Sequence, residues 1–446
     1  MNTSPTAQGQ RYDYLIIGNS AAGIAGAEAI RKLDEAGTVG IVSDEDCPAY
    51  STPSISYLVK GDVTLEKMHL RADGYYRANH FDCLFGQPAV AIDPDAREVE
   101  LGDGERVGYG KLLLACGSTP LTPPIEGLSD QKNVHHFTRV ADAVACIEQS
   151  KAAMRAKSKN RPVRAIVIGG GLIGLKAAEG LSQRVDEVVV LVRRTIMRSI
   201  LDREAAELLS GVLLRNNVLV RTQTQATRVH SKDDMVTGVD IDDGSYLDCD
   251  LLVIATGERP NCQMAIDAGA DADRGLLCGP DMQTSLPGVY AAGDCASSFD
   301  VLDRTHKTLM LWPNATLQGK IAGTNMAGGN ASYTGSFAIN AVGFFGMSIL
   351  ACGMVNPADD TYEVKTLLDN DHYSRFVIKD DRLYGYLLVN RPDNAGIYTF
   401  LIRNETPLSK LSDDVFTAEG IHMIDLPIDV RTRCMHNEME NGGQRS

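Results

Sequence analysis

Short apolar runs that lead into glycine-rich turns are the most regular feature of this chain. Residues 15–17 form one such run and residues 165–168 another, and each has the length of a strand buried on both faces. Gly18 and Gly169 follow the two runs directly, and small residues then lead into a predicted helix. The pattern therefore predicts two strand–turn–helix units, about one domain length apart.

Further apolar runs place the remaining elements. Residues 112–120 and 251–261 echo each other, because each is a buried strand that ends at a glycine and continues to a proline. We therefore expect an equivalent crossover strand in each half of the molecule. After about residue 333 the pattern changes to strands separated by polar turns. The other predicted strands cover 38–43, 187–192, 364–368, 374–379 and 383–390, with a small sheet over 85–101 and a helix over 395–403.

These elements predict an α/β fold with two Rossmann-like dinucleotide-binding domains, each of three layers, and a C-terminal α+β domain. At 446 residues, the chain exceeds what one hydrophobic core usually covers. Three prolines within residues 120–127 mark a natural domain crossing. The predicted domains are 1–125 together with 248–330, then 126–247, and finally 331–446.

The two glycine-rich turns carry the first candidate chemistry. Gly169 suits a tight turn, Gly171 the close approach of a ligand to the backbone, and Gly174 close contact between helix and strand. A helix start presents unpaired N–H groups at its positive end, which suits a pyrophosphate. The first turn lacks the second glycine, whose place Asn19 and Ser20 take. Two matched copies favour two dinucleotides held face to face over glycines used only for packing.

The residues after the second strand of each unit bear on ribose recognition. Ser43 ends the strand at 38–43, and Asp44 follows as a candidate ribose contact, with a solvated acidic turn as the alternative. In the second unit the corresponding strand ends in Arg193 and Arg194. Arginines there would suit a 2′-phosphate, or would form a solvated basic turn, so NAD and NADP both stay open.

Composition narrows the class of protein. A net charge of −15 argues against a nucleic-acid partner. No apolar stretch approaches the roughly 20 residues that span a bilayer, and residues 1–10 lack a signal-peptide core. The ten cysteines are scattered without a C-x-x-C pair, which predicts reduced thiols in a cytoplasm and no clustered metal site.

Four blocks in this order resemble the two-dinucleotide FAD/NAD(P)H oxidoreductases, the pyridine nucleotide-disulfide reductase superfamily: 18–23, 112–117, 169–174 and 284–294. The resemblance implies that the first unit binds FAD, the second binds NAD(H) or NADP(H), and the last block returns to the flavin. The FAD contacts expected on this basis are Gly18, Asn19, Ser20, Ala21, Ala22, Gly23, Ser43, Asp44, Ser51, Pro53, Ala89, Ala115, Cys116, Gly117, Gly293, Asp294 and Pro313. The expected NAD(P) contacts are Gly169, Gly171, Leu172, Ile173, Gly174, Arg193, Arg194, Thr256 and Gly257.

Two departures from the family bear on mechanism. Its disulfide reductases carry a cysteine pair beside the flavin, but residues 50–53 hold none and only Cys47 is nearby. We therefore expect electrons to pass directly from the flavin to an acceptor. Many relatives place a lysine in the Ser-x-Pro segment and a glutamate on the second glycine-rich helix, where this chain has Thr52 and Lys176. We infer that the cation has moved to Lys176, where it would stabilise reduced flavin; the alternative is an exposed helix lysine.

Residues 49–58 and 311–319 are similar to the rubredoxin-reductase and nitrite-reductase-like branch. Closer still are flavoprotein subunits that link NAD to iron–sulfur enzyme complexes, of the kind found in phenylglyoxylate dehydrogenase. The resemblance implies a complex subunit with an iron–sulfur partner, and leaves open its oligomeric state. The alternatives are a stand-alone rubredoxin or ferredoxin reductase or NADH oxidase, and a flavin-binding structural or sensor protein without turnover. Trp312, Pro313 and the third domain would form the surface on which the acceptor docks, unless Trp312 simply packs in the core.

Overall fold

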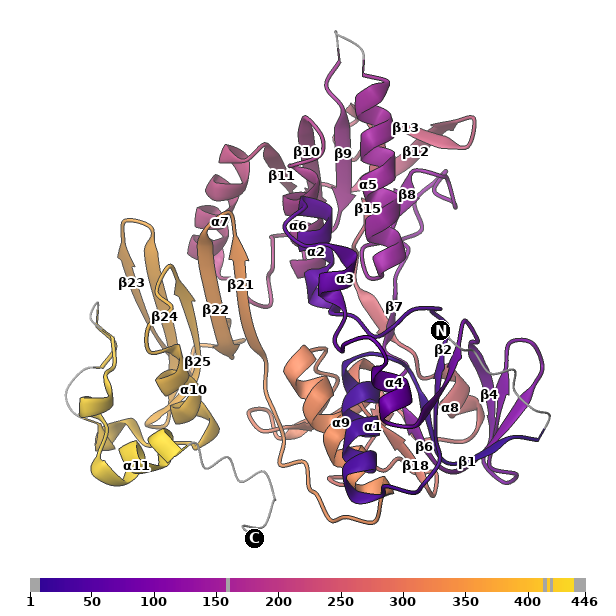
Figure 1. Ribbon diagram of the computed structural model, residues 1–446. Helices are drawn as coiled ribbons and strands as arrows, with labels where there is room; N and C mark the ends of the chain where they lie inside the picture. The colour runs from indigo at the N-terminus through magenta and orange to yellow at the C-terminus, as the bar shows by residue number, and fades with distance from the viewer. Residues whose placement is uncertain (1–8, 158–160, 412–414, 418–419, 437–446) are drawn as a thin grey trace.

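The computed structural model describes residues 9–157, 161–411, 415–417 and 420–436, so most of the polar N-terminal stretch of residues 1–10 lies outside it. The chain forms three units, which Figure 1 shows at lower right, at the top and at left. Together they confirm the expected α/β class with a C-terminal α+β part.

The first unit is built on a sheet with strand order β3-β2-β1-β6-β5-β4. Its central strand β1 is flanked by parallel β2 and β6. β6 is long enough to pair with antiparallel β5 near its start and with parallel β18 near its end. The strands are β1 (Arg11–Ile17), β2 (Val39–Ser43), β3 (Phe81–Phe85), β4 (Ala89–Asp93), β5 (Glu98–Leu101), β6 (Arg106–Leu114) and β18 (Val289–Ala291).

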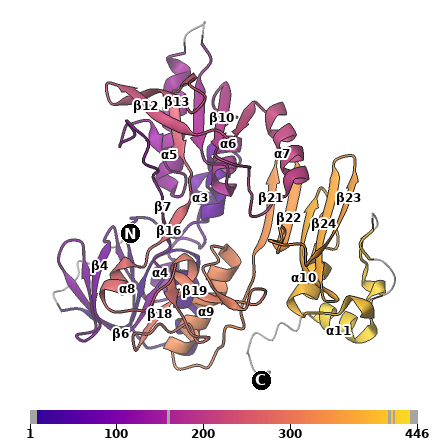
Figure 2. The same cartoon turned by 180° about the vertical axis from the view of Figure 1, so that it is seen from behind.

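Two helices from distant parts of the chain lie side by side against this sheet in Figure 1: α1 (Ala21–Leu33) and α9 (Trp312–Met326). Figure 2 shows α9 from behind, beside β18 and β19 (Ala296–Asp300). A Cβ on Gly319 would lie only 2.1 Å from the carbonyl oxygen of Ala22. The two backbones therefore touch, and α9 is held against the start of α1. The short helices α4 (Tyr75–Ala78) and α8 (Gln263–Asp267), with a small sheet of β17 (Leu276–Leu277), β19 and β20 (Thr305–Lys307), complete the unit. The short helices α2 (Ile55–Lys60) and α3 (Leu65–Met68) come from the same part of the chain, but their buried residues belong to the core of the second unit.

The second unit has a parallel sheet in the order β11-β10-β9-β15-β8. β15 pairs with β9, so it belongs to this sheet, whereas the predicted boundary after residue 247 would assign it to the first unit. The boundary between the second unit and the returning first unit therefore falls after β15, because β15 lies next to β9, the strand that precedes the turn at Gly169. The elements are β8 (Val134–His135), α5 (Val140–Arg155), β9 (Arg164–Ile168), α6 (Leu172–Leu181), β10 (Glu187–Val192), α7 (Arg203–Arg215), β11 (Val218–Thr222) and β15 (Leu251–Ile254). A three-stranded sheet of β12 (Ala226–Lys232), β13 (Met235–Ile241) and β14 (Tyr246–Asp248) adds to the core of this unit.

The two halves are joined by a two-stranded antiparallel ribbon of β7 (Ser118–Pro120) and β16 (Glu258–Pro260). These are the segments in which the sequence echoes itself, and each follows a buried strand, β6 or β15. The expected equivalent crossover strands are therefore confirmed, and the structure adds that they pair with each other.

The third unit is an antiparallel sheet in the order β21-β22-β25-β24-β23. Three of its strands and the helix at 395–403 match the predicted positions, while β21 and β22 were not predicted. Phe344 and Met347 of these two strands belong to the apolar core of the second unit, which fixes the hairpin against it. The elements are β21 (Ile339–Phe344), β22 (Met347–Gly353), β23 (Glu363–Asp369), β24 (His372–Lys379), β25 (Arg382–Val389), α10 (Ala395–Arg403) and α11 (Ile428–His436).

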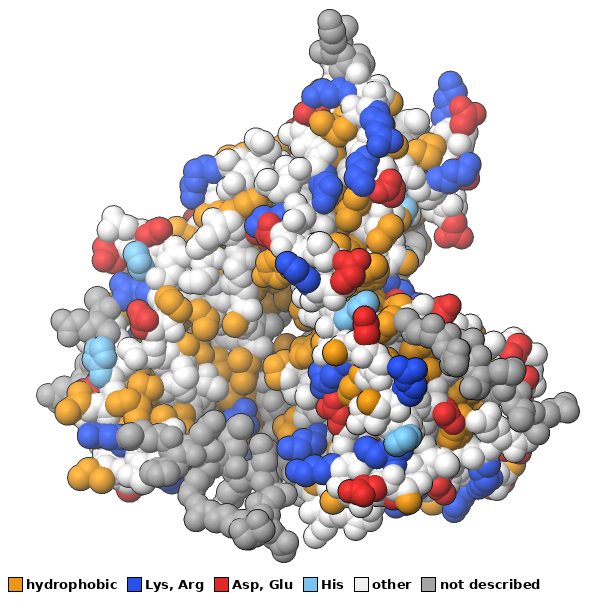
Figure 3. All heavy atoms as spheres, viewed as in Figure 1, with side chains coloured by type: hydrophobic (Ala, Val, Ile, Leu, Met, Phe, Trp, Pro, Cys, Tyr) orange, Lys and Arg blue, Asp and Glu red, His pale blue; other side chains and the backbone are white. Residues whose placement is uncertain are grey.

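The surface of the view in Figure 3 carries scattered charges of both signs, and hydrophobic side chains surround the hollow between the first and third units. Within the described residues, no helix is both long and apolar enough to cross a membrane.

Candidate functional site

Two helix starts are open to an anionic ligand. α1 begins after Ser20 and α6 after Gly171, and neither residue makes a capping side-chain hydrogen bond. Neither helix has an acidic residue in its first turn. In contrast, the start of α7 is capped by the carboxylate of Asp202, which accepts from the N–H of Ala205. The N–H groups at the two glycine-rich turns therefore remain available to a pyrophosphate.

The glycines of the turns divide into two kinds. A Cβ on Gly18 or Gly169 would lie 2.0 Å from a carbonyl oxygen of the neighbouring strand, and both residues have positive φ. A Cβ on Gly174 would lie 2.1 Å from the carbonyl oxygen of Gly169, so it too serves helix–strand packing. A Cβ on Gly171 or Gly117 would meet no atom within 4 Å. These last two positions leave open space where a cofactor can approach the backbone.

One cavity of about 840 Å³ connects the two helix starts and receives walls from all three units. It is of the size of a cofactor site. The predicted residues in its wall are Gly18, Asn19, Ser20, Ala21, Ala22, Ser43, Asp44, Thr52, Pro53, Ala115, Cys116, Gly117, Leu172, Ile173, Lys176, Gly293 and Asp294. The remaining predicted residues lie outside the wall: Gly23, Ser51, Ala89, Gly169, Gly171, Gly174, Arg193, Arg194, Thr256, Gly257 and Pro313.

Several residues outside the wall have other partners. Gly23 packs against the carbonyl oxygen of Gly18, where a Cβ would lie at 1.9 Å. Thr256 donates its hydroxyl to the carbonyl oxygen of Leu121 at 2.6 Å. Arg193 and Arg194 are exposed beyond the end of β10. Their assignment to the 2′-phosphate of NADP stays a prediction.

Asn19 replaces the second glycine of the first turn, and both polar atoms of its side chain form hydrogen bonds within the protein. Its amide nitrogen donates to the carbonyl oxygen of Cys47 at 3.1 Å, and its amide oxygen accepts from the Tyr76 hydroxyl at 2.8 Å. The same hydroxyl accepts from the N–H of Ala49 at 2.9 Å. Asn19 therefore ties the turn to the proline-rich segment that forms one wall of the cavity.

Asp44, the candidate ribose contact, lies in the cavity wall but is already paired. Its carboxylate accepts from the Arg139 guanidinium at 2.7 Å, across the gap between the first and second units. Both side chains are almost half exposed, so the pair contributes little to stability. The next residue, Glu45, accepts from the Tyr50 hydroxyl at 2.9 Å. Sequence reasoning missed Arg139 and Tyr50, because neither belongs to a nucleotide motif.

Lys176 projects from α6 into the same cavity, and its side chain is only 13% exposed. The alternative of an exposed helix lysine is therefore wrong. The ammonium forms an ion pair with the buried carboxylate of Glu179 and donates to the carbonyl oxygen of Gly343 at 3.1 Å. It also lies over the rings of Tyr57 and Phe344, at 4.9 and 5.1 Å from their centroids. Three units thus meet at one charged group, and part of its charge is neutralised by Glu179.

The β21–β22 hairpin supplies a wall of the cavity that sequence reasoning missed. Ala341, Gly343 and Gly346 line it, and the N–H of Phe345 donates to Glu179 at 3.2 Å. The hairpin has no cofactor motif, so the sequence offered no signal beyond its apolar residues.

A second missed group is the half-buried carboxyl of Glu258, which lies in the cavity wall together with Asp294. Burial raises the pKa of Glu258, and the charge of Asp294 raises it further. Burial likewise raises the pKa of Asp294. The Ser118 hydroxyl donates to Asp294 at 3.2 Å.

All ten cysteines are free thiols. Burial, followed by the acidic residues beside it, raises the pKa of Cys47 to about 11, which disfavours a reactive thiolate. Cys116 lies in the cavity wall, and its hydrogen bond to the Cys295 thiol, together with burial, raises its pKa.

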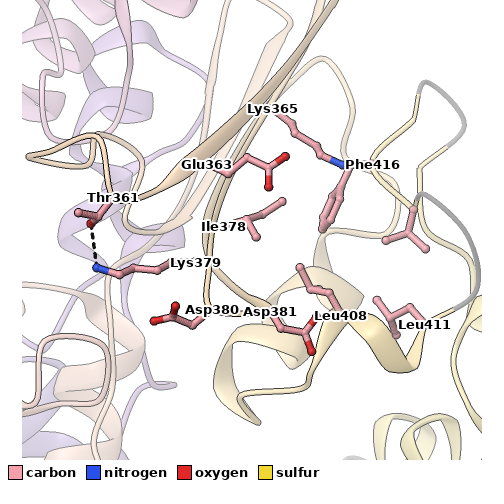
Figure 4. Close-up of a pocket in the computed structure, with 11 residues that line it drawn as sticks. Thr361, Glu363, Lys365, Ile378, Lys379, Asp380, Asp381, Leu408, Leu411 and Phe416 are labelled. Atoms are coloured by element: carbon pink, nitrogen blue, oxygen red, sulfur yellow. Dashed lines mark hydrogen bonds between the residues drawn. The ribbon is translucent and has the colours of Figure 1, made fainter.

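A separate cavity of about 700 Å³ lies within the third unit (Figure 4). Charged side chains border it, and Lys379 donates to the Thr361 hydroxyl at 2.8 Å. Lys379 also lies over the ring of Tyr362, 4.5 Å from its centroid. No glycine-rich turn opens onto it, so the larger cavity is the candidate nucleotide site.

Two uncapped helix starts that face one cavity are the arrangement expected of a protein that holds two dinucleotides. The chain belongs to the pyridine nucleotide-disulphide oxidoreductase family, whose model matches residues 12–319. It is an NAD(P)H oxidoreductase that uses FAD, and the open helix starts and the glycine positions without contacts fit both nucleotides.

Relatives span much of the chain. The epsilon subunit of NADH-dependent phenylglyoxylate dehydrogenase from Aromatoleum evansii is 29% identical over 411 residues, which are 89% of this chain and 93% of that subunit. An NADH oxidase from Methanocaldococcus jannaschii is 31% identical over 329 residues, 72% of this chain and 71% of the oxidase. The covalent complex of putidaredoxin reductase with putidaredoxin matches with a TM-score of 0.80 at 24% identity, covering 90% of this chain and 94% of the matched chain. This last likeness shows the fold alone.

Proposed function

We propose that the chain passes electrons between a nicotinamide nucleotide and an iron–sulfur partner protein, as the flavoprotein subunit of a larger cytoplasmic oxidoreductase complex. A bound flavin accepts a hydride as an electron pair and releases electrons singly, which suits this task. The chain's own residues bind and orient the two nucleotides through the starts of α1 and α6.

The observation that carries the proposal is the composition of the cavity wall. Disulfide reductases of this family place a cysteine pair beside the flavin. In this chain the corresponding segment has no such pair and contributes Tyr50, Thr52 and Pro53 to the wall of the cavity. Without a dithiol there, an acceptor has to approach the flavin itself. Met310 and Trp312 border the cavity, and Met310 is 36% exposed. We infer that an acceptor protein docks beside these two residues.

The similarity to the phenylglyoxylate dehydrogenase subunit supports a role within a complex. The test is purification of the chain from its native source under gentle, anaerobic conditions. Iron–sulfur subunits in stoichiometric amounts are expected. Anaerobic stopped-flow reduction of the bound flavin by NADH and by NADPH then identifies the coenzyme. A chain that purifies alone and transfers no electrons to any iron–sulfur protein would contradict the proposal.

The second candidate is a stand-alone NADH oxidase or a reductase of a small redox protein. The similarity to the Methanocaldococcus jannaschii NADH oxidase favours it. Rapid oxygen consumption with NADH by the isolated chain would distinguish it from the complex subunit.

A further inference from the structure

An ion pair between Asp44 and Arg139 joins the first two units at the wall of the larger cavity. Asp44 directly follows β2 of the first unit, and Arg139 directly precedes α5 of the second. A guanidinium N–H of Arg139 donates to the Oδ2 atom of Asp44 at 2.7 Å, and both residues line the cavity. The two residues are 95 positions apart in the chain, so the contact arises from the docking of the units.

The backbone beside this ion pair is held by hydrogen bonds of its own. The Asp142 carboxylate accepts from the N–H of Arg139 at 2.9 Å, which fixes the start of α5. The Tyr50 hydroxyl accepts from the N–H of Val140 at 3.2 Å and donates to Glu45 at 2.9 Å. A second contact between the units therefore runs beside the ion pair, and the ion pair is not needed to hold them together here.

The ion pair orients the carboxylate of Asp44 and leaves one of its oxygens open. A carboxylate has two oxygens with about four lone-pair sites, and the guanidinium bonds only to Oδ2. Among the described residues, none donates a hydrogen bond to Oδ1 of Asp44. The side chains of Asp44 and Arg139 are 47% and 45% exposed, so a ligand can reach the carboxylate. The end of the second strand is where dinucleotide folds place the acid that binds a ribose hydroxyl.

The charges around Asp44 also favour a paired carboxylate. Residues 44–46 are all acidic, and FAD is itself an anion. The guanidinium of Arg139 offsets one of these charges where the ribose would lie. Its contribution to folding is small because the pair is half exposed, so its main effect is on the direction and charge of Asp44.

We propose that Arg139 is a positioning residue for FAD: from the second unit, it holds Asp44 so that the Oδ1 atom accepts from a hydroxyl of the adenosine ribose. The inference deepens the proposed function, on which it rests for the flavin, and is independent of the electron acceptor. Recognition of FAD is then shared by two units, although the nucleotide turn for FAD belongs to the first unit alone.

The first experiment measures the FAD dissociation constant of the full chain by flavin fluorescence in a double-mutant cycle. Asp44→Asn is expected to weaken binding about tenfold, because the ribose loses a charged acceptor. Arg139→Gln is expected to weaken it about two- to fivefold, the range of a half-exposed ion pair. The double variant should bind no more weakly than Asp44→Asn, because Arg139 acts through Asp44. Losses that multiply in the double variant would overturn the proposal.

Two further variants separate the ion pair from other effects of the substitution. Arg139→Lys keeps the charge and a donor, so it should recover most of the lost affinity; no recovery would contradict the proposal. Arg228→Gln is the matched control, because Arg228 pairs with Glu126 at 2.8 Å, is 49% exposed and lies outside the cavity wall. It should keep the wild-type dissociation constant, and a loss equal to that of Arg139→Gln would reduce the effect to net charge.

The melting temperature of the FAD-free chain distinguishes positioning from a structural role. Arg139→Gln should leave it unchanged, whereas a lower melting temperature would assign the ion pair to holding the units together and overturn the proposal. Tighter FAD binding by Arg139→Gln would also overturn it, because the pair would then block the ribose position. A wild-type chain that binds no FAD would instead refute the proposed function, so the two failures are distinct.

Discussion

Replacing Lys176 with Met tests how much of the site depends on one charged contact. In wild type, the Lys176 ammonium pairs with Glu179, whose side chain is 6% exposed, and it holds the carbonyl oxygen of Gly343 from the third unit. Methionine keeps the length of the side chain but leaves the Glu179 carboxylate with the N–H of Phe345 as its hydrogen-bond donor. Removing one member of a buried pair costs about 3–5 kcal/mol, because the other charge stays desolvated.

The assay is urea unfolding of the FAD-bound chain followed by flavin fluorescence, which reports the opening of this cavity. We expect Lys176→Met to lower the unfolding midpoint by an amount equivalent to about 3 kcal/mol. The matched control is Lys151→Met, because Lys151 and Glu148 form an ion pair of the same helical spacing on α5. Their side chains are 45% and 62% exposed, so the control is expected to cost about 1 kcal/mol or less.

The flavin reduction potential gives an independent readout with a defined sign. Lys176→Met removes a positive charge from the cavity wall and leaves a negative one, so the potential is expected to fall. Glu179→Gln is expected to raise it, and the double variant should lie between the two. If Lys176→Met leaves both the potential and the unfolding midpoint at wild-type values, the ion pair has neither of the roles inferred for it.

Three further predictions concern the nucleotide turns. Gly171→Ala places a methyl group in open space, so NADH should bind more weakly while the melting temperature of the protein stays unchanged. Gly174→Ala should lower the melting temperature, because its methyl group meets backbone atoms. Equal effects of the two variants on the melting temperature would contradict this prediction. Arg193→Ala combined with Arg194→Ala should weaken NADPH binding more than NADH binding in fluorescence titrations, and equal losses would place both side chains away from a 2′-phosphate. Asn19→Ala removes two hydrogen bonds beneath the first turn and should cost about 1–3 kcal/mol in urea unfolding, with no loss refuting the structural role.

The nucleotide-binding core could be predicted because local patterns determine it. Apolar runs of strand length followed by Gly18 and Gly169 specify strand, turn and helix start without reference to distant residues. The strand at 187–192 and the helix at 395–403 coincide with β10 and α10 for the same reason. β15 was placed in the wrong unit, because an apolar strand gives no sign of which sheet it will join.

The candidate site could be predicted only in part. Most wall residues of the first turn were identified from their motif, but Arg139, Glu258 and the β21–β22 hairpin were not. Each reaches the cavity by a contact between segments far apart in the chain. The partner of a charge depends on such contacts, and the sequence around Lys176 gave no indication that its ammonium would hold the backbone of Gly343.

The sequence by itself determined that this chain builds two nucleotide turns on buried parallel strands, since periodicity, glycine spacing and uncapped helix starts act over a few neighbouring residues. Only the tertiary structure decided which charges face the cofactors. Burial and pairing arise where the three units meet around one cavity, and electrostatic energies in that desolvated space depend on distances that no local pattern encodes.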